Sequence, residues 1–314
     1  MPAKPPAPSP LTPISAMDQA TFVKKAMGTT AEAVEKLLDK QLPVPDGSEK
    51  RVVEAMRYAL FAGGKRLRPF LVVASASLFD VKKERALRVA AALECVHTYS
   101  LIHDDLPAMD NDELRRGRPT THIAYDEATA ILAGDGLLTL AFEILADEAT
   151  HSDSHVRSEL VLSLAKAAGI HGMVGGQMMD LAAAVNGLDM GEVTRLQQLK
   201  TGALIIYGAE AGAILAKAPT RPRHALVGYA RDLGLAFQIV DDLLDIEGDE
   251  EELGKAVGKD EDAGKATFVS LLGVDRARQQ AKLLSEQAIE YLQDFDDKAL
   301  LLRSLAEFVI SRRN

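Results

Sequence analysis

The stretch that decides the fold reads HTYSLIHDDLPAMDNDELRRG and covers residues 97–117. Apolar residues lead into two adjacent aspartates, Asp104 and Asp105, and Pro107 then prevents a regular helix from continuing. These residues predict a helix that ends at an acidic pair, with Asp110 in the turn beyond it. Asp104 and Asp110 can then converge on one ion.

A second acidic cluster lies far downstream, in the sequence FQIVDDLLD of residues 237–245. Asp241 and Asp245 are four residues apart, so on a helix their side chains differ by about 40° in azimuth and about 6 Å along the axis. Grouped carboxylates beside apolar helix faces are costly unless cations compensate them. Two solvated acidic patches are the alternative interpretation, but both clusters have apolar flanks, which favours two halves of one cation site.

The ligand type indicates which cation the clusters would hold. Oxygen-only ligands favour Mg2+ or Mn2+ over Zn2+ or Cu2+. Mg2+ keeps several waters and is commonly completed by substrate phosphates rather than by protein ligands alone. The two clusters therefore predict a diphosphate ligand that bridges them through metal.

Basic residues upstream support a diphosphate ligand. The segment from Arg51 to Phe70 holds five basic residues and one acidic residue, a local charge of +4 (five minus one), in a chain of formal net charge −10. Within it, residues 63–69 (GGKRLRP) combine flexible backbone with clustered cations, which suits an anion held by Arg side chains. Arg115 and Arg116 add two cations directly after the first acidic cluster.

The rest of the chain carries helix signals. Thr29 and Glu32 have the spacing of a capping box, which predicts that a helix begins there and ends before Pro43. Apolar residues recur at helical spacing over 277–309, and alternating strand patterns are essentially absent. The expected fold class is all-α, a single-domain helical bundle in which many helices pack around a central set.

Composition excludes several classes of protein. The chain has 314 residues, of which 47% are hydrophobic, too many for a wholly disordered protein. No apolar stretch approaches the roughly 20 residues of a membrane-spanning helix, so no membrane span is expected. The acidic balance argues against general nucleic-acid binding. The lone Cys95 excludes an internal disulfide and a cysteine-based zinc site.

The ends of the chain and one acidic run carry further expectations. Six prolines within the first 13 residues predict a disordered, Pro-rich leader over residues 1–17, followed by one all-α domain over 18–314. The leader has the pattern of neither a secretory signal nor a transit peptide, so the expected location is the cytoplasm. The acidic run 247–252 is expected to form a surface loop.

Taken together, the motifs resemble those of the trans-isoprenyl diphosphate synthases, most nearly the bacterial farnesyl diphosphate synthases. The resemblance covers residues 50–275 and depends on two aspartate-rich motifs downstream of a Gly-Gly-Lys element. The matching strings are GGKRLRP (63–69), DDLPAMD (104–110), LRRG (114–117), GGQMMD (175–180), KTG (200–202) and FQIVDDLLD (237–245). After Lys265 the family often shows Thr-Tyr-Pro, whereas this chain has Thr267-Phe268-Val269.

The resemblance implies a role for each matching residue. The residues implied to bind isopentenyl diphosphate are Lys65, Arg68, His97 and Arg116. The residues implied around the allylic diphosphate are Arg115, Lys200, Thr201, Gln238, Lys255 and Lys265. The implied magnesium ligands are Asp104, Asp110 and Asp241, with Asp105, Asp242 and Asp245 orienting them or holding metal-bound water.

The resemblance also implies the chemistry and its partners. Mg2+, three ions per site, or Mn2+ in its place, makes the allylic diphosphate a leaving group. Isopentenyl diphosphate attacks the resulting cation, which the Thr201 hydroxyl, the Lys200 carbonyl and the Gln238 amide oxygen stabilise. Family members have a helical isoprenoid-synthase fold with the active-site cavity between central helices, and a homodimer is expected.

Product length and three rival functions stay open at this stage. Tyr99, five residues before Asp104, is expected to stop the growing chain at fifteen carbons, as in the bacterial farnesyl synthases; an ordinary core tyrosine is the alternative. A geranylgeranyl diphosphate synthase is the nearest alternative function. A terpene cyclase would not need the second diphosphate site at Lys65, and a non-catalytic subunit would not need intact aspartate motifs.

Overall fold

The computed structural model describes residues 16–186, 188–247 and 267–312. The described residues form helices and one short hairpin, which confirms the expected all-α class. The helices of the first half are α1 (Ala16–Gln41), α2 (Lys50–Leu60), α3 (Leu67–Ser77), α4 (Lys83–Asp104), α5 (Thr121–Ala124), α6 (Glu127–Ala146) and α7 (Ser154–Ala168). Those of the second half are α8 (Met173–Asn186), α9 (Met190–Gln197), the π-helical turn η1 (Gln198–Gly202), α10 (Ala203–Leu215), α11 (Thr220–Glu247), α14 (Phe268–Leu272), α15 (Val274–Glu290), the 3-10 turn η2 (Gln293–Ala299) and α16 (Leu300–Ser311). The hairpin pairs β1 (Leu114–Arg115) antiparallel with β2 (Arg118–Pro119).

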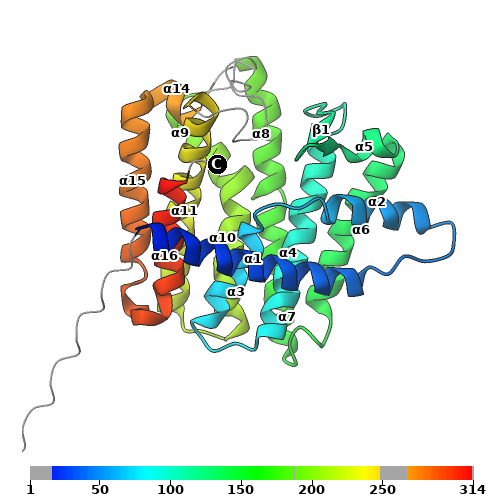
Figure 1. The fold of residues 1–314 in the computed structure, drawn as a ribbon, viewed down its shortest axis with the longest axis horizontal. Helices are drawn as coiled ribbons and strands as arrows, with labels where there is room; N and C mark the ends of the chain where they lie inside the picture. The colour runs from blue at the N-terminus through cyan, green and yellow to red at the C-terminus, as the bar shows by residue number, and fades with distance from the viewer. Residues whose placement is uncertain (1–15, 187, 248–266, 313–314) are drawn as a thin grey trace, which may run out of the picture.

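Helix α10 lies at the centre of the bundle, packed against α3, α4, α7 and α11. Helix α6 packs on α4, α15 packs on α11, and α1 crosses the bundle against α3, α4 and α16 (Figure 1). The β1–β2 hairpin and the C-terminal end of α4 lie at the same end of the bundle, the top in Figure 1. That end carries the residues that the sequence singles out.

The central position of α10 follows from its sequence, ALIIYGAEAGAIL, which is apolar except for Glu210, and Glu210 is paired with Arg223. Two glycines let a neighbour approach closely. A Cβ on Gly208 would lie 3.2 Å from the backbone oxygen of Arg68, and a Cβ on Gly212 would collide with the backbone nitrogen of Ala76. Helix α3, which begins at Leu67 directly after the turn of residues 63–66, is therefore held directly against the core.

Helix α4 carries the first acidic motif and ends as predicted. Its residues from Val89 to Val96 are almost completely buried, and the helix ends at Asp104, before Pro107. The backbone N–H of Asp110 donates to the carbonyl of Asp104 at 2.9 Å, so the turn after the helix folds back onto the helix end.

The predicted start of the first helix is wrong. Helix α1 begins at Ala16, and Thr29 lies in its interior, where the hydroxyl donates to the carbonyl of Lys25 at 3.0 Å. Val23 and Met27 are buried, so packing against the bundle extends the helix upstream of the capping-box pattern. The helix ends at Gln41, before Pro43, as predicted.

Some expectations fall outside the described part of the chain. Residues 1–15 of the expected leader and nearly all of the acidic run 247–252 are not among the described residues, so the leader, the domain boundary and the loop stay predictions. Helix α6, by length and composition alone, is apolar enough to cross a membrane, contrary to the expectation from the sequence. Half of it is buried within the protein, against α2, α4 and α7, as in a core helix.

The close contact between α10 and α3 predicts opposite effects of two glycine substitutions. Gly212→Ala should lower the free energy of unfolding by about 1–3 kcal/mol, because the added methyl meets backbone that cannot move aside. Gly28→Ala, on the exposed face of α1 with nothing within 4 Å, should raise it by about 0.5–1 kcal/mol. Urea denaturation of both variants measures this difference. An equal effect at the two positions would contradict the packing account.

Candidate active site

A cavity of about 180 Å³ opens beside the C-terminal half of α4. Helix α4, helix α8 and the turn η1 form its walls, and α3 adds Arg68. Asp104 and Lys200 line it together with Tyr99, one turn deeper on α4, which is only 7% exposed. The remaining lining residues are His97, Ser100, Leu101, Met173, Val174, Gln177 and Thr201. The cavity therefore joins a charged end to a largely apolar interior.

The charge at this end is not balanced. Burial raises the pKa of Asp104 to about 6, and the neighbouring carboxylate of Asp110 adds to the shift, while Lys200 and Arg115 oppose it. Burial alone would lower the pKa of Lys200, but Asp180, Asp104 and Asp110 outweigh it and raise that pKa. One ammonium group thus serves several carboxylates, and a further cation would be stabilised here.

The turn η1 and helix α8 fix the position of Lys200. The π-helical turn presents Lys200 and Thr201, and such turns inside helices are frequent at functional sites. Gly176 of α8 has no room for a side chain, because a Cβ would collide with the backbone nitrogen of Lys200. Four residues later, Asp180 meets the Lys200 ammonium at 2.5 Å. The GGQMMD string therefore holds η1 against α8.

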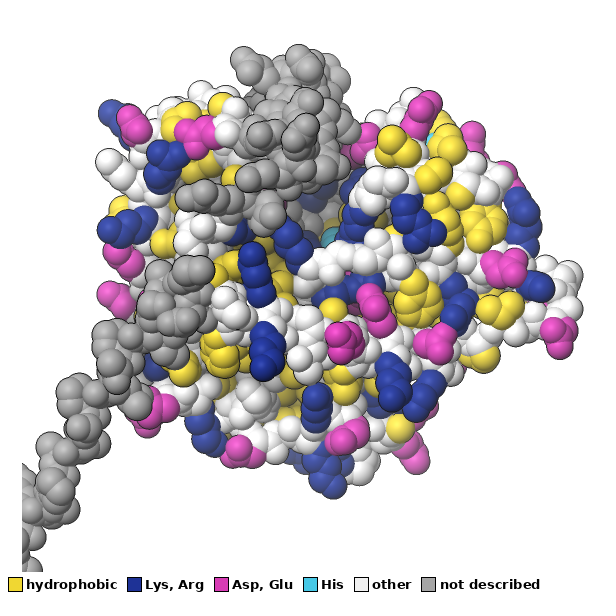
Figure 2. All heavy atoms as spheres, viewed as in Figure 1, with side chains coloured by type: hydrophobic (Ala, Val, Ile, Leu, Met, Phe, Trp, Pro, Cys, Tyr) yellow, Lys and Arg dark blue, Asp and Glu magenta, His cyan; other side chains and the backbone are white. Residues whose placement is uncertain are grey.

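A second, basic pocket of about 400 Å³ lies next to the cavity, and Arg68 and His97 line both. Its cationic residues are Lys65, Arg66, Arg68 and Arg116, and its other lining residues are Ala62, Gly64, Leu67, Glu94, His97 and Phe237. In Figure 2 a hollow near the middle of the visible face is bordered by Lys and Arg side chains, with a His side chain inside it. A diphosphate would meet several cations at once here.

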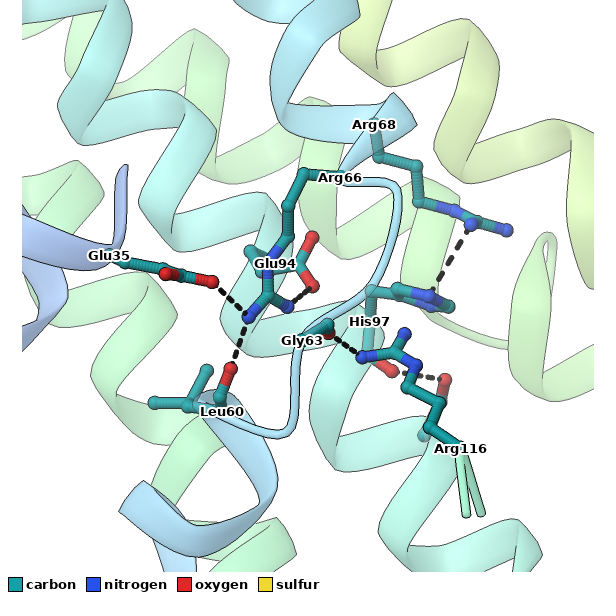
Figure 3. Close-up of polar contacts among 9 residues, drawn as sticks. Glu35, Leu60, Gly63, Arg66, Arg68, Glu94, His97 and Arg116 are labelled. Atoms are coloured by element: carbon teal, nitrogen blue, oxygen red, sulfur yellow. Dashed lines mark hydrogen bonds and ion pairs between the residues drawn. The ribbon is translucent and has the colours of Figure 1, made fainter. Parts of the chain in front are cut away.

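The backbone of residues 63–69 shapes this pocket. Gly63 and Gly64 have φ values of 82° and 122°, in the left-handed region that favours glycine. A Cβ on Gly64 would lie 2.6 Å from the guanidinium of Arg116, which donates to the Gly63 carbonyl (Figure 3). The two glycines are thus required both for the turn and for the approach of Arg116.

His97 is held neutral between cations. Burial lowers its pKa well below the usual value, and the guanidinium groups of Arg68 and Arg116 lower it further. The Arg68 Nη1 lies 3.5 Å from the His97 Nε2, which accepts because a guanidinium can only donate. Arg68 and Arg116 therefore carry two positive charges, and the neutral imidazole of His97 offsets neither of them.

Arg115 lies in the β1 strand and contacts the first acidic cluster from the outside. Its Nε donates to Asp105 at 2.7 Å, and its guanidinium lies 3.7 Å from Asp112. Asp105 is buried and bound to this arginine, unlike its neighbour Asp104. The Arg115–Asp105 pair therefore ties the hairpin to the end of α4.

The second acidic cluster lies on α11, and its three carboxylates differ in environment. Asp242 is buried and accepts from the Gln238 amide at 2.9 Å and from the backbone N–H of Phe268 at 3.0 Å. Asp245 is also buried, whereas the side chain of Asp241 is 39% exposed. Asp241 is the carboxylate of this cluster with the most open access.

Arg312, near the C-terminus, contacts Asp241 at 2.5 Å, and no sequence motif points to this contact. Its guanidinium stacks over the Phe237 ring, 3.9 Å from the centroid, and donates to the Phe237 carbonyl. Only the position of α16 against α11 brings this arginine to the acidic motif. Lys255 and Lys265, also expected at the site, lie outside the described residues.

Comparisons with known proteins match this arrangement. Residues 49–307 match the family model described as Polyprenyl synthetase. The chain belongs to the polyprenyl synthetase family. As members of this family do, it catalyses prenyl transfer, which confirms that it is an enzyme.

The relatives of this polyprenyl synthetase cover nearly its whole length. A crystal structure titled as an FPP/GFPP synthase from Zymomonas mobilis is 52% identical, with a TM-score of 0.85, and covers 93% of this chain and 99% of that one. A farnesyl diphosphate synthase from Haemophilus influenzae is 44% identical over 90% of this chain and 95% of its own. A geranylgeranyl diphosphate synthase from Cyanophora paradoxa is also 44% identical, over 90% and 94%.

Polyprenyl synthetases use Mg2+, and the acidic end of the cavity suits that ion. Asp104 and Asp110 offer hard oxygen ligands, and the pKa of Asp104 is raised first by burial and then by Asp110, so a divalent ion would stabilise its charged form. Within the described ranges, no group of three or more His, Cys, Asp or Glu side chains lies close enough to hold a metal alone. A Mg2+ ion at this end would therefore need further ligands, which a bound diphosphate can supply.

The charge on Asp104 should cost stability in the metal-free protein, with a defined pH dependence. Its pKa rises from 3.8 to about 6 on folding, so the native state binds this proton more tightly than the unfolded state. The loss of stability is therefore absent well below pH 3.8 and complete well above about pH 6. Asp104→Asn should therefore raise the melting temperature in EDTA above this window and leave it unchanged below. A shift that is independent of pH would contradict the assignment.

Proposed function

We propose that this polyprenyl synthetase is a farnesyl diphosphate synthase. It joins isopentenyl diphosphate head-to-tail to dimethylallyl diphosphate and then to geranyl diphosphate, and releases diphosphate. The observation that carries the proposal is the pair of adjacent pockets, one basic and one with an acidic end and an apolar interior, that share Arg68 and His97. Two diphosphates and one hydrocarbon tail fit this division.

The basic pocket would take isopentenyl diphosphate. Lys65, Arg68 and Arg116 would bind its diphosphate, and neutral His97, whose Nε2 accepts from Arg68, would donate one hydrogen bond there through its other ring nitrogen. Several guanidinium groups around one anion favour planar, two-pronged contacts with phosphate oxygens.

The cavity would take the allylic diphosphate. Asp104, Asp110 and Asp241 would hold Mg2+, three ions when diphosphate is bound, with Mn2+ as an alternative. The metal, when bound, neutralises the diphosphate and makes it a leaving group. Around it, the expected cationic contacts are Arg115, Lys200, Lys255 and Lys265. Arg312 neutralises Asp241 in the metal-free chain and would have to withdraw for Asp241 to act as a ligand.

The carbocation would be stabilised by oxygen dipoles and protected from water. The Thr201 hydroxyl and the Lys200 carbonyl belong to the turn η1 beside the cavity. The Gln238 amide nitrogen donates to Asp242, which turns the amide oxygen away from that carboxylate. The attack by isopentenyl diphosphate leaves a proton that the released diphosphate can accept, so no side chain is needed as a base.

Incubation of the protein with labelled isopentenyl diphosphate and each allylic primer tests the proposal. With Mg2+ the expected product is linear and has fifteen carbons. EDTA should abolish turnover, because without the metal ions the negative charge of the leaving diphosphate is not neutralised. A cyclic hydrocarbon would indicate a terpene cyclase, and no turnover a non-catalytic subunit. A twenty-carbon product would indicate a geranylgeranyl synthase, which the similarity to the Cyanophora paradoxa enzyme makes the second candidate.

Tyr99 is proposed as the floor that limits product length. It is buried in the cavity wall, and its ring meets His103 edge-on at 5.7 Å between centroids, so it cannot easily move aside. Tyr99→Ala should give products longer than fifteen carbons, because the tail gains the volume of the ring. Tyr99→Phe keeps the ring and should leave the product unchanged. An unchanged product distribution in the alanine variant, measured by chromatography, would refute the floor.

We infer a homodimer and a cytoplasmic location for this enzyme. The support for a dimer is apolar surface on α6 and α8, where Leu132 is 58% and Met178 61% exposed. Large exposed apolar side chains of this kind are typical of protein interfaces. A partner on that surface would also explain why α6 is apolar on the side that the bundle leaves uncovered.

A further inference from the structure

Arg66 ends the loop of residues 63–66 that precedes α3, and its side chain is buried. Arg66 is 1% exposed and its partner Glu94 2% exposed. The guanidinium pairs with Glu94, donates to the Leu60 carbonyl, and reaches Glu35 at 3.0 Å (Figure 3). A charged pair without access to water persists only when its geometry and hydrogen bonds compensate the lost hydration.

These contacts bind one loop to three helices. Glu35 comes from α1, Leu60 from α2 and Glu94 from α4, so the guanidinium of Arg66 joins all three to the loop that precedes α3. The backbone at Arg66 is left-handed, with a φ of 49°. A non-glycine residue keeps this costly conformation where its surroundings impose it, which happens most often at functional sites.

The Arg66–Glu94 pair also sets the position of the substrate-facing arginine. Glu94 and His97 are three residues apart on α4 and therefore neighbours on one face of the helix. Arg66 pairs with Glu94 (Figure 3). The Arg68 Nη1 lies 3.5 Å from the His97 Nε2, so the two arginines contact α4 in the same order as their partners. A shift of the first contact would move the second.

Glu94 further maintains the charge of the pocket. Burial lowers the pKa of Arg68 and of Arg116, and the Glu94 carboxylate acts in the opposite direction on both. Among the described residues that line the basic pocket, Glu94 is the acidic one. It lies behind the guanidinium groups, paired with Arg66, rather than among the groups open to solvent.

We propose that Arg66 and Glu94 are positioning residues for the diphosphate in the basic pocket. Their buried pair fixes the loop so that Lys65 and Arg68 stand where the anion binds, while the pair itself borders the pocket with side chains only 1% and 2% exposed and offers the ligand almost no accessible surface. The identity of that ligand as isopentenyl diphosphate rests on the proposed function.

Arg66→Lys tests the proposal, because lysine keeps the charge but cannot contact Glu94, Leu60 and Glu35 together. The KM for isopentenyl diphosphate should rise roughly tenfold, while kcat and the KM for geranyl diphosphate stay unchanged. Arg57→Lys is the matched control. Arg57 also joins two helices, with bonds to Asp39 at 2.5 Å and to the Leu42 carbonyl at 2.8 Å, but lies outside the lining of both pockets.

The control should lose thermal stability without any change in the three kinetic values. A variant Arg66→Lys whose KM for isopentenyl diphosphate equals that of the wild type would overturn the proposal. So would an equal loss in all three values, because it would indicate a structural role alone.

Glu94→Gln keeps the shape of the side chain and serves if Arg66→Lys does not fold. It should raise the KM for isopentenyl diphosphate and leave kcat and the KM for geranyl diphosphate unchanged. The double variant should be no worse than the more severe single variant, because both remove one interaction. Effects that multiply would contradict a shared role.

Calorimetry of isopentenyl diphosphate binding separates this proposal from the proposed function. A wild-type chain that binds the ligand and yields no product contradicts the function, and the loss of affinity in Arg66→Lys still tests the positioning role. Equal affinity in wild type and Arg66→Lys overturns the positioning role whatever the product is.

Discussion

Unbalanced negative charge at the end of α4 is the constraint on which the rest of the site depends. Asp104 is half-buried beside Asp110, and the ammonium of Lys200 also serves Asp180. A carboxylate whose pKa is raised by its surroundings is costly to keep ionised. Asp104 is the last residue of α4, and α4 packs against α3, α6 and α10, so the bundle determines where this charge lies.

The neighbouring pocket has the opposite imbalance. Arg68, Arg116 and neutral His97 face a hollow with positive charge that Glu94, behind them, offsets in part, with smaller contributions from Asp241 at Arg68 and Asp105 at Arg116. The cavity would thus be stabilised by a bound cation and the basic pocket by a bound anion, and the two share Arg68 and His97. A metal diphosphate in one pocket and a second diphosphate in the other would satisfy both needs, as the proposed function requires.

Local patterns predicted those parts of the molecule that local chemistry determines. Pro107 after an acidic pair gave the end of α4 correctly, because proline removes the donor that a helix needs. The capping box at Thr29 failed, because burial of residues far upstream extends the helix. Arg312 was missed as a member of the site, and Asp180 was matched only as part of the GGQMMD string without a role, since each meets its partner only through tertiary packing. The motifs gave the residue types of the site, while the pairing of those residues required the fold.

A crystal structure with Mg2+ and diphosphate tests the central claim most directly. The account predicts metal ions that bridge the diphosphate to Asp104 and Asp110 on one side and to Asp241 on the other, with the Arg312–Asp241 pair broken. Metal bound at one acidic motif alone, with Arg312 still on Asp241, would contradict it.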